Sequence, residues 1–147
     1  MTLLPCLLLL ASASPFSFHD PGAGSLELRE NGRPVFVYNY GMMWKPGVPE
    51  SRRRSSYLHP VYAPDGVVLT DDFPKDHYHH RGISWMWPVV MIEGKRYTLW
   101  EIEGIRQRFI RWTARETTAS SARLAMENGW YVGERQVARE TVEITAH

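Results

Sequence analysis

Residues 76–82 concentrate the side chains that could do chemistry. Three of the six histidines fall within four positions of this segment, which reads Asp76-His77-Tyr78-His79-His80-Arg81-Gly82. An imidazole gains or loses a proton near neutral pH and also ligates metals, so the cluster is compatible with acid/base catalysis and with metal binding. Residues two apart share one face of an extended backbone. An extended segment would therefore point His77, His79 and Arg81 to the same side.

Two kinds of site use these side chains. In the first, His77, His79 or His80 acts as a general acid or base tuned by Asp76, and Arg81 holds a substrate oxygen. In the second, His77 and His79 chelate a divalent metal ion, for which the sequence fixes no third ligand. The acid/base assignment is slightly favoured. The alternative to both is a surface loop with several histidines and no site.

Neighbouring residues could complete a binding surface. His59 could join from a nearby loop, and Trp85 and Trp87 border the histidine segment. The apolar face of an indole can stack on a sugar ring, although a single Trp more often packs in a core. The predicted ligand is therefore a small molecule, with carbohydrate as the favoured class. A non-catalytic module that binds the same ligand is a further hypothesis.

The elements around this segment read as short strands and turns. Asn31-Gly32 is a strong two-residue hairpin signal, and Asn128-Gly129 offers a second turn. No window of helical length holds a clean apolar stripe. The pattern predicts an all-β fold, an antiparallel β-sandwich or barrel. The expected extended pieces are residues 26–29, 34–40, 57–62, 67–70, 83–87, 89–92, 96–100, 105–112, 122–126 and 137–145.

Composition bounds the class of protein. The chain has 147 residues, of which 44% are hydrophobic and 22% charged, so it can build a core and is not disordered. The net charge of +1 excludes nucleic-acid binding by bulk charge. The single cysteine excludes an internal disulfide framework and a Cys-based zinc site. Because the last predicted strand is still running at His147, residues 14–147 are expected to be the N-terminal part of a larger domain.

The first thirteen residues predict a signal peptide. Leu3 to Leu10 is almost continuously apolar, and Ala11-Ser12-Ala13 follows as a small-x-small cleavage pattern. No Lys or Arg precedes the apolar run. No stretch approaches the roughly 18 apolar residues of a transmembrane helix, so no membrane anchor is expected. The sequence thus predicts export to the periplasm or the extracellular space.

Two motifs also carry a family resemblance. Residues 57–66 read Tyr-Leu-His-Pro-Val-Tyr-Ala-Pro-Asp-Gly, and residues 72–82 read Asp-Phe-Pro-Lys-Asp-His-Tyr-His-His-Arg-Gly. Together with Trp85-Met86-Trp87-Pro88, they resemble the bacterial family of unknown function labelled methane oxygenase PmoA, or PmoA-like. The resemblance covers roughly residues 25 to 145.

That resemblance carries its own expectations. It implies an exported β-sandwich. Such a sandwich is reminiscent of mutarotase-like supersandwiches, which place histidines around a sugar, but this second likeness is an analogy of fold alone. Family members look about twice as long as this chain. The label also belongs to a multi-spanning membrane subunit, which does not match a chain without such spans, so we interpret it as an inherited name. Taken literally, it implies a metal-dependent, oxygenase-like site as the alternative.

Overall fold

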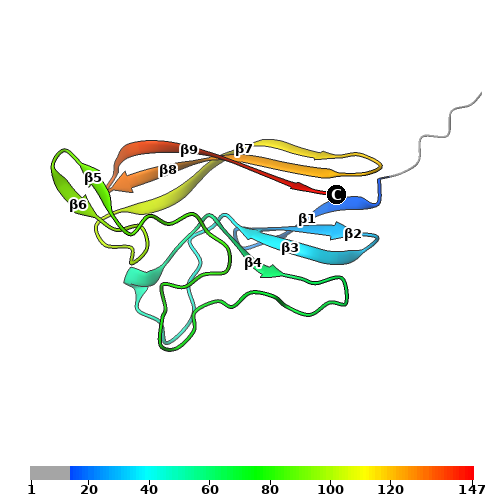
Figure 1. Cartoon of the computed structure of the whole chain (residues 1–147), viewed down its shortest axis with the longest axis horizontal. Helices are drawn as coiled ribbons and strands as arrows, with labels where there is room; N and C mark the ends of the chain where they lie inside the picture. The colour runs from blue at the N-terminus through cyan, green and yellow to red at the C-terminus, as the bar shows by residue number, and fades with distance from the viewer. Residues whose placement is uncertain (1–13) are drawn as a thin grey trace, which may run out of the picture.

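The protein is described by a computed structural model that covers residues 14–147. The predicted signal peptide lies outside the described residues. Two antiparallel sheets face each other (Figure 1). The first contains β1 (Phe16–Gly22), β2 (Ser25–Glu30), β3 (Arg33–Asn39) and β4 (Tyr57–Val61). The second contains β7 (Arg106–Thr117), β8 (Ala122–Val132) and β9 (Arg135–Ala146). The predicted antiparallel β-sandwich is confirmed.

A small hairpin and two long loops complete the fold. The strands β5 (Val90–Ile92) and β6 (Lys95–Tyr97) form a separate two-stranded sheet at one end of the molecule (Figure 1). A single 3-10 turn, η1 (Glu50–Arg52), lies in the loop between β3 and β4. The segment from 62 to 89 is irregular, and it contains the histidine cluster. Within residues 14–147, no helix is long and apolar enough to cross a membrane.

The core lies between the inner faces of the two sheets. Alternate residues of β2 and β3 point inward, and they contact Ala122, Leu124 and Met126 of β8. Leu28 and Met126 are almost completely buried. This alternation follows from the two-residue period of a strand, which places every second side chain on the same face. Apolar burial therefore holds the two sheets together.

A polar cluster interrupts this core and joins side chains of β3, β7, β8 and β9. The Asn128 amide donates hydrogen bonds to the Tyr38 hydroxyl (3.3 Å) and to Glu140 (3.0 Å). The Gln107 amide also donates to Glu140, at 3.0 Å. Burial raises the pKa of Tyr38 to about 12, so its hydroxyl stays protonated. Four strands of the sandwich thus share one hydrogen-bond network.

One of the two predicted hairpin turns is confirmed and the other is wrong. Asn31 and Gly32 both have positive φ angles (49° and 77°) and join β2 to β3, as the Asn-Gly signal predicts. Asn128 and Gly129 instead lie inside β8. There, a Cβ on Gly129 would lie 2.5 Å from the Tyr131 ring. The glycine permits close packing of that ring, and the turn to β9 occurs at Gly133 and Glu134.

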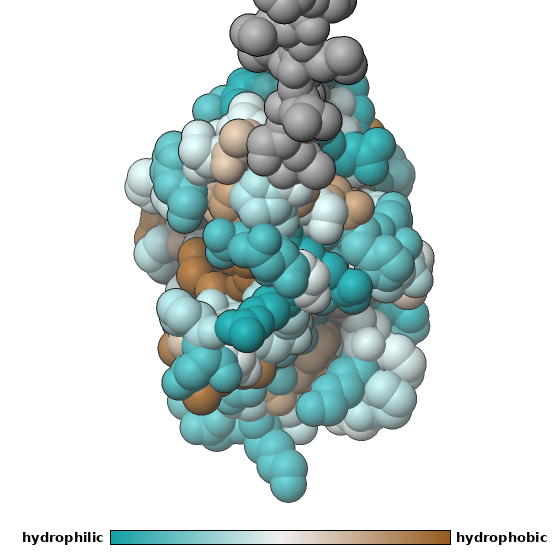
Figure 2. All heavy atoms as spheres, turned by 90° about the vertical axis from the view of Figure 1, so that its right-hand side faces the viewer, coloured by the Kyte–Doolittle hydropathy of each residue, from teal (hydrophilic) through white to brown (hydrophobic). Residues whose placement is uncertain are grey.

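The predicted extended pieces at 67–70 and 83–87 form no strands. They contribute single bridges, Tyr62 with Val68 and Leu58 with Ile83. Their large apolar side chains remain on the surface, because no neighbouring strand pairs with them along their length. The end of the molecule away from the β5–β6 hairpin carries the β2–β3 turn and the β7–β8 turn (Figure 1). Hydrophilic residues make up most of that end face, with hydrophobic residues visible in small areas between them (Figure 2).

Candidate functional site

The histidine cluster sits on two consecutive turns. The backbone N–H of His77 donates to the Pro74 carbonyl (3.1 Å), and that of His80 donates to the His77 carbonyl (2.9 Å). The expectation of an extended backbone, with His77, His79 and Arg81 on one face, is therefore wrong. A turn brings residues three apart together, so the rings of His77 and His80 stack with centroids 4.8 Å apart and an interplanar angle of 12°.

Trp100 joins the three histidines from a distant part of the sequence. Its ring lies edge-on to His79 (5.5 Å between centroids) and to His80 (5.1 Å). The backbone N–H groups of Leu99 and Trp100 both donate to the Trp87 carbonyl, which fixes the loop that carries the indole. Trp100 is 38% exposed, so its ring remains accessible to a ligand.

Asp76 orients the His77 ring. The Nδ1 atom of His77 lies 3.0 Å from Oδ2 of Asp76, and both side chains are largely exposed. This hydrogen bond is the main reason why the pKa of the Asp76 carboxyl lies below its ordinary value. When Nδ1 carries the donated proton, Nε2 of a neutral His77 is the atom that can accept a proton from a ligand. Asp76 and His77 thus form the predicted carboxylate–imidazole pair.

The surroundings of His79 favour the neutral form of its imidazole. Burial lowers the pKa of its imidazole, and the nearby His80 lowers it further. Its ring is also edge-on to His80, with centroids 4.5 Å apart. A neutral imidazole is a competent hydrogen-bond acceptor and general base at pH 7.

An open hollow of about 670 Å³ is lined by Asp76, His77, His80 and Trp100, whereas His79 does not line it. The wall of the hollow combines two carboxylates, two imidazoles and one indole. The hollow continues along residues 81–86. The lining residues are Asp71, Pro74, Asp76, His77, His80, Arg81, Gly82, Ile83, Ser84, Met86 and Trp100. We call this surface the histidine hollow. The indoles of Trp85 and Trp87, which were expected to bind substrate, are exposed (65% and 55%) but do not line it.

Arg81 was expected to hold a substrate oxygen, but its side chain is fully buried. Its Nε donates to Asp72 (2.5 Å) and its Nη2 to the Tyr57 hydroxyl (2.7 Å). A third bond, from Nη1, reaches the Arg52 carbonyl at 3.2 Å. The guanidinium also lies over the rings of Tyr57 and Phe73. Arg81 therefore attaches the histidine loop to β4 and to the β3–β4 loop.

Gly82 allows that attachment. Its φ angle is +42°, and a Cβ at this position would lie 1.9 Å from the Leu58 carbonyl oxygen. The next residue, Ile83, exchanges backbone hydrogen bonds with Leu58 (2.9 and 3.0 Å). Only a residue without a side chain lets the two backbones approach so closely.

His59, the fourth predicted histidine, lies apart from the histidine hollow. Its Nδ1 atom is 2.9 Å from the Thr70 hydroxyl, and its carbonyl accepts a bond from the Asn39 amide (2.6 Å). It lines a separate hollow of about 320 Å³ together with residues of β3, β4, the β3–β4 loop and the loop at 71–83, among them Trp44 and Asp72. The structure therefore brings together Asp76, His77, His79 and His80, and it separates His59, Trp85 and Trp87 from them.

The metal prediction finds no support in the arrangement of donors. Among residues 14–147, no group of three or more His, Cys, Asp or Glu side chains is placed to hold a metal ion. The rings of the two predicted ligands, His77 and His79, lie edge to face with centroids 5.6 Å apart, and no third donor is placed to hold a metal ion with them in the described part of the chain. We therefore derive no chemistry through a metal at this site.

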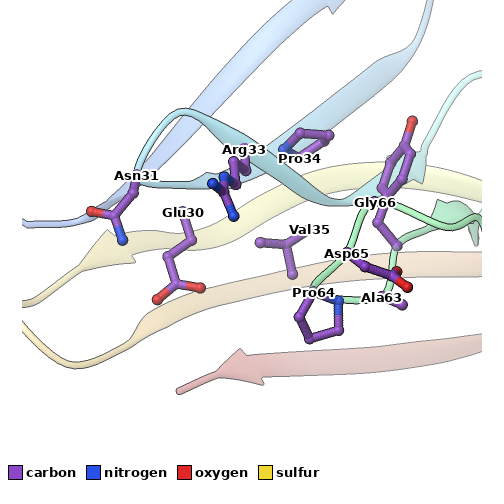
Figure 3. Close-up of a pocket in the computed structure, with 10 residues that line it drawn as sticks. Glu30, Asn31, Arg33, Pro34, Val35, Ala63, Pro64, Asp65 and Gly66 are labelled. Atoms are coloured by element: carbon purple, nitrogen blue, oxygen red, sulfur yellow. The ribbon is translucent and has the colours of Figure 1, made fainter.

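A further open hollow lies at the other end of the first sheet. It measures about 750 Å³ and lies between the β2–β3 turn and the turn at 63–66 (Figure 3). Glu30 and Arg33 contribute charged groups from one side, and Asp65 contributes one from the other. No histidine and no tryptophan lines it, so the residues predicted to do chemistry are all elsewhere.

Fold and site together define a class: an all-β, two-sheet protein whose candidate site lies on the loops outside the sheets. The chain belongs to the family described as Family of unknown function (DUF6807), which matches residues 25–147. No curated protein and no solved structure matches the chain. The family description names no activity, so the resemblance to PmoA-like proteins stays a prediction.

Proposed function

We propose that the histidine hollow binds a carbohydrate ring and performs acid/base chemistry on it. The observation that carries this proposal is the contact between an exposed indole, Trp100, and an imidazole cluster that includes the Asp76–His77 pair. A sugar presents apolar C–H faces and hydroxyl edges. An indole suits the first, and carboxylates and imidazoles suit the second.

Each group has a distinct role in this proposal. Trp100 packs on one face of the ring, and Asp71 accepts hydrogen bonds from hydroxyl groups. His77, oriented by Asp76, exchanges a proton with the substrate through Nε2. Positive charges on three adjacent imidazoles would repel one another. His79 stabilises the cluster because its lowered pKa favours the neutral form, which adds no such charge. Arg81 is a positioning residue, since its buried guanidinium attaches the loop to β4.

Binding can be tested with immobilised glycans and isothermal titration. We expect Trp100→Ala to abolish binding of any glycan that the wild-type protein retains. Trp85→Ala is the matched control, because Trp85 is more exposed than Trp100 and does not line the hollow. Equal loss in both variants, or loss in the control alone, would contradict the proposed place of the ligand.

Catalysis needs a separate test. If His77 transfers a proton, His77→Gln should keep glycan affinity within about threefold and reduce turnover by about 10²-fold or more. A protein that binds a glycan but converts none would instead be a non-catalytic binding module. Metal analysis adds an independent check: stoichiometric metal that disappears in a His77→Ala/His79→Ala variant would overturn the metal-free proposal.

Export is a second part of the proposal, and it rests on the apolar run and the small-x-small pattern at residues 3–13. We expect expression in a bacterial host to yield an extracytoplasmic form that begins at Ser14. N-terminal sequencing of each cell fraction tests this. A form that retains Met1 and stays in the cytosolic fraction would contradict it.

A further inference from the structure

The basic run Arg52-Arg53-Arg54 is not a solvated loop. Arg54 is 5% exposed, and its Nη2 donates to the carbonyls of Leu99 and Trp100. Arg52 donates to the Glu101 carbonyl, and Arg106 donates back to the Ser51 carbonyl. The guanidinium groups therefore lie between the β3–β4 loop and the loop at 98–104. The partners of Arg54 are neutral carbonyls, so its charge is not balanced by these bonds.

Within residues 14–147, no carboxylate lies within ion-pair distance of Arg54 or Arg106. Arg53 has one such partner, the exposed Glu50, at 2.7 Å. Burial, followed by the positive charge of Arg81, lowers the pKa of Arg54 to about 9. A buried cation without a counter-charge is costly, and a bound anion would remove that cost.

A small cavity adjoins these arginines. It has room for one water-sized particle, about 10 Å³. Arg53, Arg54 and Arg106 line it together with Gln107 and the apolar side chains of Leu99, Ile102 and Ile105. Two buried N–H donors of the lining residues, Nε of Arg53 and Nη1 of Arg54, have no hydrogen-bond partner in the described part of the chain.

We propose that this cavity binds a single small inorganic anion of the halide class, held by Arg53, Arg54 and Arg106. A water molecule needs acceptors for its own protons, whereas an anion only accepts, and the unpaired groups here are donors. The small volume suits a monatomic anion better than phosphate or an organic carboxylate. Since Arg54 bonds to the backbone of Leu99 and Trp100, the anion also stabilises the loop that carries the Trp100 indole.

The test compares thermal unfolding of the full chain in sodium chloride, sodium bromide and sodium gluconate at equal ionic strength. A ligand that binds only the folded state raises Tm with its concentration. We expect Tm in 200 mM chloride or bromide to exceed that in gluconate by about 3 °C. Equal Tm values in the three salts would overturn the proposal.

Variants and diffraction locate the effect. Arg54→Met should abolish the halide difference and Arg106→Met should reduce it, whereas Arg33→Met, at the exposed β2–β3 turn, should leave it unchanged. If Arg54→Met does not fold, a crystal of the wild-type protein grown in bromide decides whether the anion site exists. Anomalous density in the cavity beside Arg54 supports the site, and a water molecule there with bromide elsewhere overturns it.

Discussion

The sandwich and the loops beside it are held together by different forces. In the sandwich, apolar side chains of β2, β3 and β8 pack against one another with almost no exposure. In the loops at 50–56, 71–83 and 98–104, buried guanidinium groups connect one backbone to the next. Apolar packing tolerates many sequences of similar volume, whereas a buried arginine needs particular partners at particular distances. The candidate site lies in the loops.

The largest effect is expected from the sandwich core. Leu28→Ala should lower the free energy of unfolding by about 3 to 5 kcal/mol, because it removes buried methyl groups and leaves a cavity. Leu28 is 1% exposed and belongs to the main core cluster. Denaturant unfolding measures the change. Ile110→Ala, at a position that is 37% exposed on β7, is the control and should cost far less. Similar losses in both variants would contradict the proposed core.

A smaller and more local effect is expected from Arg81. Arg81→Met leaves the Asp72 carboxylate without its cationic partner, which should cost about 2 to 4 kcal/mol, since Asp72 retains some exposure and a hydrogen bond from the Tyr57 hydroxyl. Hydrogen exchange should show faster exchange in residues 71–83 and unchanged protection in β2 and β8. Arg108→Met, which removes an exposed ion pair with Glu134, is the matched control. Uniform loss of protection throughout the chain would show that loops and sandwich unfold as one unit.

The difference between the sandwich and the loops also explains which features the sequence could predict. The alternation in residues 26–29 and 34–40, and the Asn31-Gly32 turn, predict the sheet correctly because both depend on local periodicity. The second Asn-Gly pair fails, because Gly129 is required by the ring of Tyr131, a contact that the turn rule does not consider. Local rules succeed where neighbouring residues in the sequence decide the conformation.

The site is less predictable for the same reason. The histidine cluster is visible in the sequence, but the stacking of His77 on His80 depends on turns after Pro74. The contact of Trp100 with His80 joins residues twenty positions apart, and that of Arg54 with Leu99 spans 45. No local signal distinguishes Trp100 from Trp85, or a buried Arg54 from a solvated one. Such contacts follow from the arrangement of the loops on the sandwich.

The polar cluster of β3, β7, β8 and β9 tests whether buried hydrogen bonds matter as much to the sandwich as apolar packing does. Tyr38→Phe removes the hydroxyl that accepts the Asn128 bond, and it should cost about 1 kcal/mol. The loss is modest, because the Asn128 amide keeps its bond to Glu140. Denaturant unfolding measures it, with Tyr62→Phe, a half-buried tyrosine outside the core cluster, as the control. A loss as large as that of Leu28→Ala would place this network among the main determinants of the sandwich.

The smallest effect is a pH dependence from the histidine turn. Because the pKa of His79 is lowered in the folded protein, the unfolded chain binds more protons between the folded value and about 6.5. Stability should therefore be constant above that range and fall as the pH decreases through it. Comparison of Tm for the wild type and His79→Gln from pH 5 to 7.5 isolates this contribution, and the variant should show a shallower decrease. His19→Gln, on an exposed position of β1, serves as the control. A decrease that persists unchanged in His79→Gln would assign the pH dependence to other groups, and the loop would then contribute no acid sensitivity beyond that of the sandwich.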